Sequence, residues 1–259
     1  MGSDSPDRGT LGTIRNAARV LKLLSTGPSY QPLTELAREA GMSLPTIHRL
    51  LKSLANAGFV EQHPQSSRYS LGPEFVHLSE RYLSRHAALR ALAPYLVELR
   101  NTTKATILVA LLVRDAVVYV DRIDGEDVGG VYRKFHRSHS ALETAAGRTL
   151  LAHADDETWD QAVSSAIAQG LTPHGIHLQD LTKGHRVEWA RQPYLLLPDP
   201  QLTDFIEVAV PVSDQRDQVR AALAATARAD VFADEAYTQR VTTQLLCAAT
   251  TARQAMNDA

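Results

Sequence analysis

Residues 33–58 read LTELAREAGMSLPTIHRLLKSLANAG, and this stretch decides the fold of the N-terminal part of the chain. Apolar residues at helical spacing from Leu33 to Ala40 predict a short helix, and Gly41 suits its C-terminal end. Ser43 is a candidate N-cap for a further helix that fills the rest of the stretch, with Pro45 tolerated in its first turn. Two short helices that meet at a turn containing glycine indicate a helix-turn-helix.

The second of these helices has two unlike faces when its residues are placed about 100° apart. One arc is apolar and is expected to pack inward: Ile47, Leu50, Leu51 and Leu54. The opposite side and its flanks carry the other residues: Pro45, Thr46, His48, Arg49, Lys52 and Asn56. In the major groove of DNA, Arg can read guanine and Asn adenine, while Thr and Lys take phosphates. For an isolated helix of this kind, the simpler interpretation is a polar face exposed to solvent. The neighbouring segments therefore have to show whether this face binds DNA.

The neighbouring segments complete a recognisable unit. Upstream, apolar residues at helical spacing from Ile14 to Leu24 predict a first helix, which Gly27 and Pro28 end. Downstream, residues 59–61 and 68–71 predict two short strands joined by a polar loop. Three helices followed by a hairpin form a winged helix-turn-helix, and this order favours double-stranded DNA as the partner.

We assign expected roles within this unit. Base contacts are predicted for Thr46 and Arg49, with Pro45, His48 and Asn56 as further candidates. Contacts to phosphates are predicted for residues on the same helix, its start and the wing: Ser43, Lys52, Ser66 and Arg68. Arg15 and Arg19 are further candidates at the DNA backbone.

The distribution of charge along the chain also favours a nucleic-acid partner for the N-terminal part. The 259 residues carry a net charge of −2, but residues 1–72 hold eight Lys and Arg against five Asp and Glu. That part is therefore +3 and the remainder −5, an asymmetry that favours a nucleic-acid partner for the basic part. An excess of +3 is modest and carries no assignment alone.

Composition excludes several classes of protein. The one cysteine cannot form an internal disulfide, which suits a reducing compartment. The strongest apolar run, residues 107–113, is far too short to span a membrane, and residues 1–12 lack the apolar core of a signal peptide. We expect a cytoplasmic protein with a disordered tail at residues 1–12 and no membrane partner.

The C-terminal part mixes helices and strands. Helical apolar stripes predict a connector helix at 73–87 and a second helix after it. Strands are predicted at 106–113, 116–123, 194–197, 205–213 and 218–225, with one more candidate at 127–134. Helices are predicted at about 144–153, 156–168, 178–192 and 234–254, the last with Cys247 buried in it. Without a repeated βαβ order, this pattern indicates an α+β domain with an antiparallel sheet flanked by helices.

The chain resembles the IclR family of bacterial transcriptional regulators over nearly its whole length. In the N-terminal part the similar residues are Leu36-Ala37, Gly41, Thr46, His48-Arg49-Leu50-Leu51, Leu54 and Tyr69-Ser70-Leu71-Gly72. In the C-terminal part they are residues 141–152 and Val208-Ala209-Val210-Pro211-Val212, which are similar to a GAF-like effector-binding domain. The resemblance implies a winged helix-turn-helix at 13–72, the connector at 73–87 and the effector-binding domain at 88–259.

The resemblance also implies a function. Such proteins bind DNA sequence-specifically, and a small-molecule metabolite, commonly a carboxylate or an aromatic compound, modulates their affinity. It implies a homodimer or a dimer of dimers on a palindromic operator. Repression and activation both follow from the same DNA-binding unit, and no cofactor is expected.

The effector pocket inferred from the family is altered in this chain. Its expected residues are Ala141, Leu142, Thr144, Asp204, Phe205 and Glu207. The family often has His in place of Leu142, Cys near Glu207, and Gly where Asp204 stands. If these positions line a pocket, its extra negative charge would repel an anionic metabolite unless Glu207 is protonated or is paired, for example with Arg137 or Arg148. The hypothesis is therefore that the effector is not a small dicarboxylate, or that the protein senses a neutral or amine-bearing molecule. Alternatively, Glu207 faces solvent at a strand edge, because a one-residue shift reverses a strand's faces.

Other functions rest on weaker features. The chain has ten histidines, which raises the alternative of a metal- or His-dependent hydrolase. Two pairs are spaced three residues apart: His136 with His139, and His174 with His177. Neither pair belongs to a metal-binding or catalytic motif, so we expect no metal site and no enzyme. The remaining alternatives are an effector-independent DNA-binding regulator with a degenerate pocket and a pure interaction module.

Overall fold

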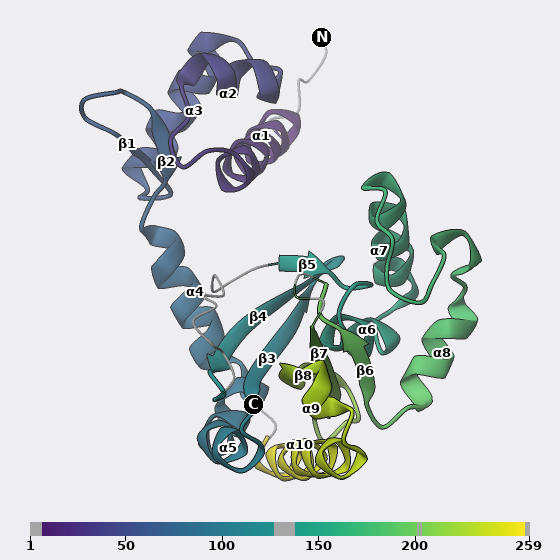
Figure 1. The fold of residues 1–259 in the computed structure, drawn as a ribbon. Coiled ribbons are helices and arrows are strands. Elements are labelled where there is room, and N and C mark those ends of the chain that lie inside the picture. The colour runs from purple at the N-terminus through teal and green to yellow at the C-terminus, as the bar shows by residue number, and fades with distance from the viewer. Residues whose placement is uncertain (1–6, 127–137, 201, 203, 257–259) are drawn as a thin grey trace. The chain divides into compact units, whose positions relative to one another are not determined.

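The computed structural model describes residues 7–126, 138–200, 202 and 204–256, with side chains from residue 12 onward. The chain divides into two compact units, Met1–Leu83 and Ser84–Ala259, which we call the head and the body. Figure 1 labels the helices and strands of both.

The head contains the predicted helices and hairpin. Its elements are α1 (Asp7–Thr26), α2 (Leu33–Ala40), α3 (Leu44–Asn56), β1 (Val60–Gln62), β2 (Tyr69–Leu71) and α4 (Glu74–Arg85), the last extending just past the boundary between the units. Helix α1 begins earlier than predicted, so residues 7–12 of the expected disordered tail are helical. Residues 1–6 of that tail lie outside the described residues.

The three helices and the hairpin share one apolar core. Its buried members are Val20, Leu24, Leu36, Ala37, Ala40, Ile47, Leu51, Val60 and Tyr69. Ile14, predicted to belong to the packed face of α1, is instead 64% exposed. The longer helix packs through its second half, and its packed arc is centred on Val20 and Leu24, one turn apart.

Short connections fix the helix-turn-helix and the wing. Gly41 ends α2 with a φ of 63°, and its N–H donates to the carbonyls of Ala37 and Arg38. This left-handed conformation is open to glycine at little cost. Gln31 pairs with Tyr69 through two backbone hydrogen bonds of 2.8 Å each, so the wing is attached to the segment between α1 and α2.

The body is built on one six-stranded antiparallel sheet with the order β5-β4-β3-β8-β7-β6. Its strands are β3 (Thr106–Val113), β4 (Ala116–Ile123), β5 (Ser138–Ser140), β6 (Leu195–Pro198), β7 (Phe205–Ser213) and β8 (Val219–Arg228). The candidate strand at 127–134 lies outside the described residues. The α+β class and the antiparallel sheet are confirmed.

Helices cover this sheet on both sides. They are α5 (Ala87–Thr103), α6 (Ala145–Ala152), α7 (Asp156–Ala168), the 3₁₀ turn η1 (Leu178–Asp180), α8 (Lys183–Arg191), α9 (Ala229–Phe232) and α10 (Glu235–Ala255). Helix α6 packs on the face that carries Ala110, Ala209 and Ala224. Helices α5 and α10 pack on each other and against the central strands.

The predicted helix at 178–192 is in fact two elements, η1 and α8. Leu181 is extended between them, with φ −72° and ψ 117°. Thr182 then starts α8 through a reciprocal cap with His185. The hydroxyl and imidazole provide the new helix with its own beginning, so the two elements do not merge.

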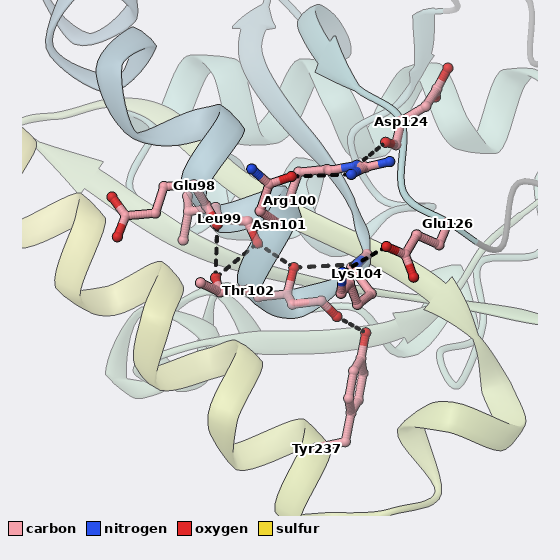
Figure 2. A network of polar contacts seen from close by, with 11 residues as sticks. Glu98, Leu99, Arg100, Asn101, Thr102, Lys104, Asp124, Glu126 and Tyr237 are labelled. Atoms are coloured by element: carbon pink, nitrogen blue, oxygen red, sulfur yellow. Dashed lines mark hydrogen bonds and ion pairs between the residues drawn. The ribbon is translucent and has the colours of Figure 1, made fainter.

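Polar contacts join the C-terminal end of α5 to its neighbours (Figure 2). The Arg100 guanidinium donates to the Asp124 carbonyl oxygen at 2.8 Å, and the Lys104 ammonium lies 2.7 Å from the Glu126 carboxylate. From α10, the Tyr237 hydroxyl donates to the Thr103 carbonyl oxygen at 3.1 Å. These contacts attach α5 to the end of β4 and to α10.

Candidate functional site

The outward face of α3 presents every residue predicted to contact DNA from this helix or its start. These are Ser43, Pro45, Thr46, His48, Arg49, Lys52 and Asn56, all exposed. On the opposite side Ile47 and Leu51 are fully buried, and Leu50 and Leu54 pack against the same core. The predicted division of this helix into an inward and an outward face is therefore confirmed.

Basic side chains of this surface have no internal acidic partner. Within the described part of the chain, Arg49 and Lys52 of α3 and Arg68 of the wing take part in no ion pair. In contrast, Arg38 of α2 lies within 4 Å of both Glu35 and Glu39. Unpaired cations on one exposed surface are suited to an external polyanion.

The start of α3 has an exposed hydroxyl pair. Ser43 occupies the N-cap position, as predicted, but its side chain makes no capping bond to the helix. Its Oγ lies 2.8 Å from the Thr46 Oγ1 instead. In this pair one hydroxyl donates to the other, so one hydroxyl hydrogen remains for an external acceptor such as a phosphate at this positive helix end.

The wing places Ser66 and Arg68 in exposed positions at its tip and base. Across the loop, the His63 N–H donates to the Arg68 carbonyl oxygen at 2.8 Å. Tyr30, which sequence reasoning missed, donates from its hydroxyl to the Glu61 carboxylate at 2.8 Å and stacks edge-on against His63. The wing is thus supported from the segment after α1.

The two candidate arginines of α1 differ in their surroundings. The Arg19 guanidinium donates to the Glu39 carbonyl oxygen at 3.1 Å, so it joins α1 to α2. Arg15 is exposed on the same helix. Of the two, Arg19 has a structural contact in the head.

In the body, Glu207 lies beneath α6 and is only 3% exposed. Its Oε1 accepts the backbone N–H of Ala146 at 2.8 Å, and its Oε2 accepts the Tyr119 hydroxyl at 2.5 Å. The alternative in which Glu207 faces solvent is therefore wrong. The reason is that β7 is an inner strand, hydrogen-bonded to β6 and β8 on its two sides, with α6 over this face.

Tyr119 is the principal site residue that sequence reasoning missed. Burial raises its pKa well above the ordinary value, and the charge of Glu207 and the hydrogen bond to it act in the same direction. A hydrogen bond with Thr144 opposes the shift, while the Asp199 carboxylate adds to it. The phenol therefore remains a hydrogen-bond donor to Glu207 at neutral pH.

Thr144 shapes the turn that leads into α6. Its Oγ1 accepts the Gly147 N–H at 2.9 Å, which makes it the N-cap of the helix. A Cβ on Gly147 would lie 2.4 Å from the Ala141 carbonyl oxygen, so only glycine fits there. Thr144 and Glu207 together satisfy two amides at the start of α6.

The other expected effector residues do not belong to the hydrogen-bonded network of Tyr119, Thr144 and Glu207. The Ala141 and Leu142 side chains are buried in an apolar cluster with Trp159 and Trp189, between α6, α7 and α8. The Asp204 carboxylate is 61% exposed and 3.7 Å from Arg228, and Phe205 is partly buried at the start of β7. Of the six, the structure brings Thr144 and Glu207 together in one hydrogen-bonded network.

Arg148, a suggested partner of Glu207, donates to two carbonyl oxygens. Its Nε lies 2.8 Å from the Leu142 oxygen and its Nη2 2.6 Å from the His174 oxygen. The guanidinium also stacks over Trp189, and burial lowers its pKa to about 10. Arg148 thus holds the turn before α6 to the loop after α7. Arg137 lies outside the described residues.

The histidine pairs do not build a metal site in the described structure. Across the described ranges, no three His, Cys, Asp or Glu side chains lie close enough to share a metal ion. His139 contacts the Tyr119 ring, with centroids 6.3 Å apart, and His136 lies outside these ranges. In the same part of the chain, no helix has the length and apolarity to cross a membrane.

Comparison with protein families matches both units. Residues 13–64 match the model described as the IclR helix-turn-helix domain. Residues 80–253 match the model described as the bacterial transcriptional regulator IclR C-terminal domain, which alone covers more than half of the chain.

Curated relatives include regulators of several organisms. The chain is 24% identical to the HTH-type transcriptional regulator XynR of Escherichia coli over 82% of its length and 84% of the relative. It is 30% identical to the regulator KdgR of Dickeya chrysanthemi over 56% of its length, and there it spans about half (47%) of the relative.

Solved structures share the fold over nearly the whole chain. An IclR transcriptional regulator from Alicyclobacillus acidocaldarius is 26% identical, with a TM-score of 0.72 and 95% and 99% of the two chains covered. An IclR homologue from Microbacterium hydrocarbonoxydans, complexed with 4-hydroxybenzoate, is 18% identical, with a TM-score of 0.68 and 94% and 98% covered.

Proposed function

The chain belongs to the IclR family of bacterial transcriptional regulators and is a DNA-binding regulator, and from this premise we propose how its two units act. The head inserts α3 into the major groove of an operator. The body binds a small molecule, and binding changes the affinity of the head for DNA. The observation that carries this proposal is the exposed face of α3, with Arg49 and Lys52 free of acidic partners in the described structure.

The residues of the head have distinct proposed roles. Thr46 and Arg49 contact base edges, assisted by Pro45, His48 and Asn56. Phosphate contacts come from Ser43, Lys52, Ser66 and Arg68. Arg15 adds a backbone contact, while Arg19 mainly holds α1 to α2.

We propose that the regulator is a homodimer or a dimer of dimers on a palindromic operator. One head contacts too few base pairs for useful specificity, so two heads on related half-sites are needed. Helix α4 supports this, because none of its side chains is buried and it exposes Val76, Leu78 and Tyr82. Such an apolar surface on the last helix of the head is suited to pairing with a second copy.

The proposed effector site lies in the body, at the start of α6. It rests on the network of Tyr119, Thr144 and Glu207 and on the complex of the homologous fold with 4-hydroxybenzoate. Binding there would shift the protein between two states that differ in DNA affinity.

Capture and sequencing of genomic DNA tests this function. Purified protein is mixed with sheared DNA from the source genome, and the bound fragments are sequenced, with Arg49→Ala as the control. We expect a shared palindromic site among the fragments held by the wild type and its loss in the variant. Equal recovery of the same fragments by both proteins would contradict the role assigned to α3.

A further inference from the structure

A carboxylate of the chain itself occupies the positive end of α6. The first amides of a helix and its dipole form a site for anions. Here the Ala146 N–H donates to Glu207, and the Gly147 N–H donates to Thr144. The Tyr119 hydroxyl, a further donor, also points to Glu207. The three donors that an external anion would use are therefore engaged.

A second, independent observation is an unsatisfied hydroxyl beside this carboxylate. Thr226 of β8 lies directly opposite Glu207 in the register of β7 and β8, on the same face of the sheet. It is 2% exposed, and among the described residues its Oγ1 has no hydrogen-bond partner. A buried hydroxyl in this condition costs free energy, and a ligand can satisfy it.

We propose that Glu207 is a built-in anion that fills the anion site of α6, and that the effector is uncharged at this point and hydrogen-bonds to Thr226 through a hydroxyl. The ligand class rests on the proposed effector function of the body. The placement of the anion rests only on the contacts of Glu207.

The chemistry of the neighbouring atoms selects an alcohol over an acid. A carboxylate ligand would find the Ala146 and Tyr119 donors engaged and would lie against the charge of Glu207. A ligand hydroxyl, in contrast, can donate to the Glu207 carboxylate and accept from Thr226. A polyol or sugar-like molecule thus matches the site better than a small organic acid.

Removal of the side chain tests the built-in anion. Thermal unfolding of full-length Glu207→Ala, Glu207→Gln and wild type is measured in sodium formate against equal sodium chloride. We expect formate to raise the Tm of Glu207→Ala saturably by several degrees and to leave the other two unchanged, because their site is filled. If Glu207→Ala is unfolded without formate, its refolding on addition of formate is measured by circular dichroism instead of a Tm.

The outcomes of this measurement are decisive. No specific effect of formate on Glu207→Ala would overturn the proposal, as would saturable stabilisation of the wild type by formate. Glu207→Gln is the matched control, because it keeps the volume of the side chain and an acceptor for Ala146 while it removes the charge.

Thr226→Val and matched ligands test the hydroxyl. We expect the Tm of Thr226→Val to equal or exceed that of the wild type, because the methyl group replaces an unsatisfied polar atom. A fall of several degrees would show that the hydroxyl has a partner in the folded protein and would overturn its role. Pairs that differ only in the acid group, such as glucitol and gluconate, are then compared on the wild type, where stabilisation by the acid alone would overturn the ligand class.

These measurements separate the proposal from the function of the protein. DNA binding is measured in parallel by gel shift with the captured fragments. Failure of the gel shift with a positive formate result would reject the regulatory role and keep the built-in anion. The reverse result would reject the built-in anion alone.

Discussion

At the scale of single residues, Tyr119 carries an energetic consequence of its burial. Its pKa lies well above the ordinary value because of burial first and Glu207 second. In the unfolded chain the phenol ionises near pH 10. Above that pH the folded protein retains a proton that the unfolded chain has released, so the free energy of unfolding falls as the pH rises.

Tyr119→Phe tests this linkage. We expect the substitution to cost about 1–3 kcal/mol at pH 7, since the buried Glu207 carboxylate loses a hydrogen-bond donor. Between about pH 9.5 and 11 its stability should fall less steeply than that of the wild type. Urea unfolding at a series of pH values measures both effects, with Tyr194→Phe as a control at a partly exposed tyrosine. Equal slopes for Tyr119→Phe and wild type would contradict the assignment.

Arg49 provides a prediction for the head. Arg49→Ala should weaken binding to the specific operator by about 10- to 100-fold, as expected for the loss of one base-reading contact. Its Tm should remain unchanged, because the side chain is exposed and packs on nothing in the core. Gel shifts with specific and scrambled duplexes measure the difference. The matched control is Arg90→Ala on an exposed site of α5, and a similar loss in that variant would refute the role of Arg49.

Sequence patterns predict the residues of a site that lie on one helix, but not those that lie far apart in the sequence. The face of α3 follows from spacing within one helix, so the sequence predicts that Arg49 and Lys52 lie on its exposed side, as they do. Tyr119 and Glu207 lie 88 positions apart, and no local pattern joins them. The prediction that Cys247 is buried is wrong: it is exposed, because α10 packs through an arc that includes Val241, Leu245 and Ala248.

At the scale of elements, the buried start of α6 depends on the groups that cap it. All eight of its residues are buried, so water cannot easily satisfy the amides at its start. Thr144 and Glu207 serve two of these amides. The sequence predicted the helix from its period, but only the register of β7 with β8 places Glu207 beneath it.

Thr144→Ala measures the contribution of this cap. We expect a loss of about 1–2 kcal/mol in the free energy of unfolding, at the upper end of values for N-caps. Thr144→Ser keeps the hydroxyl and should retain most of the stability. Urea denaturation followed by circular dichroism gives both values. If alanine and serine proved equally harmful, loss of the methyl group would explain the effect instead of loss of the cap.

At the scale of the whole molecule, the head and the body have separate cores. The head was predictable as a unit because its helices and wing follow one another within a short segment. The strand order of the body was not, because β3 and β8 are neighbours in space and far apart in sequence.

Two core substitutions test the independence of the units. Leu51 in the head and Leu245 in the body are both fully buried. Leu51→Ala should destabilise the head by about 2–5 kcal/mol, and Leu245→Ala the body by a similar amount. Calorimetry should show one transition lowered in each variant and the other unchanged. A single transition lowered equally by both would mean that the units unfold together.

The pairing of β3 with β8 also affects how the chain folds during its synthesis on the ribosome. All elements of the head leave the ribosome before β3, whose sequence is TILVALLV, whereas its partner β8 begins only at Val219. A nascent chain therefore carries a complete head while one edge of an apolar strand stays open. Over that interval of synthesis, we expect the growing polypeptide to depend on chaperones to avoid aggregation.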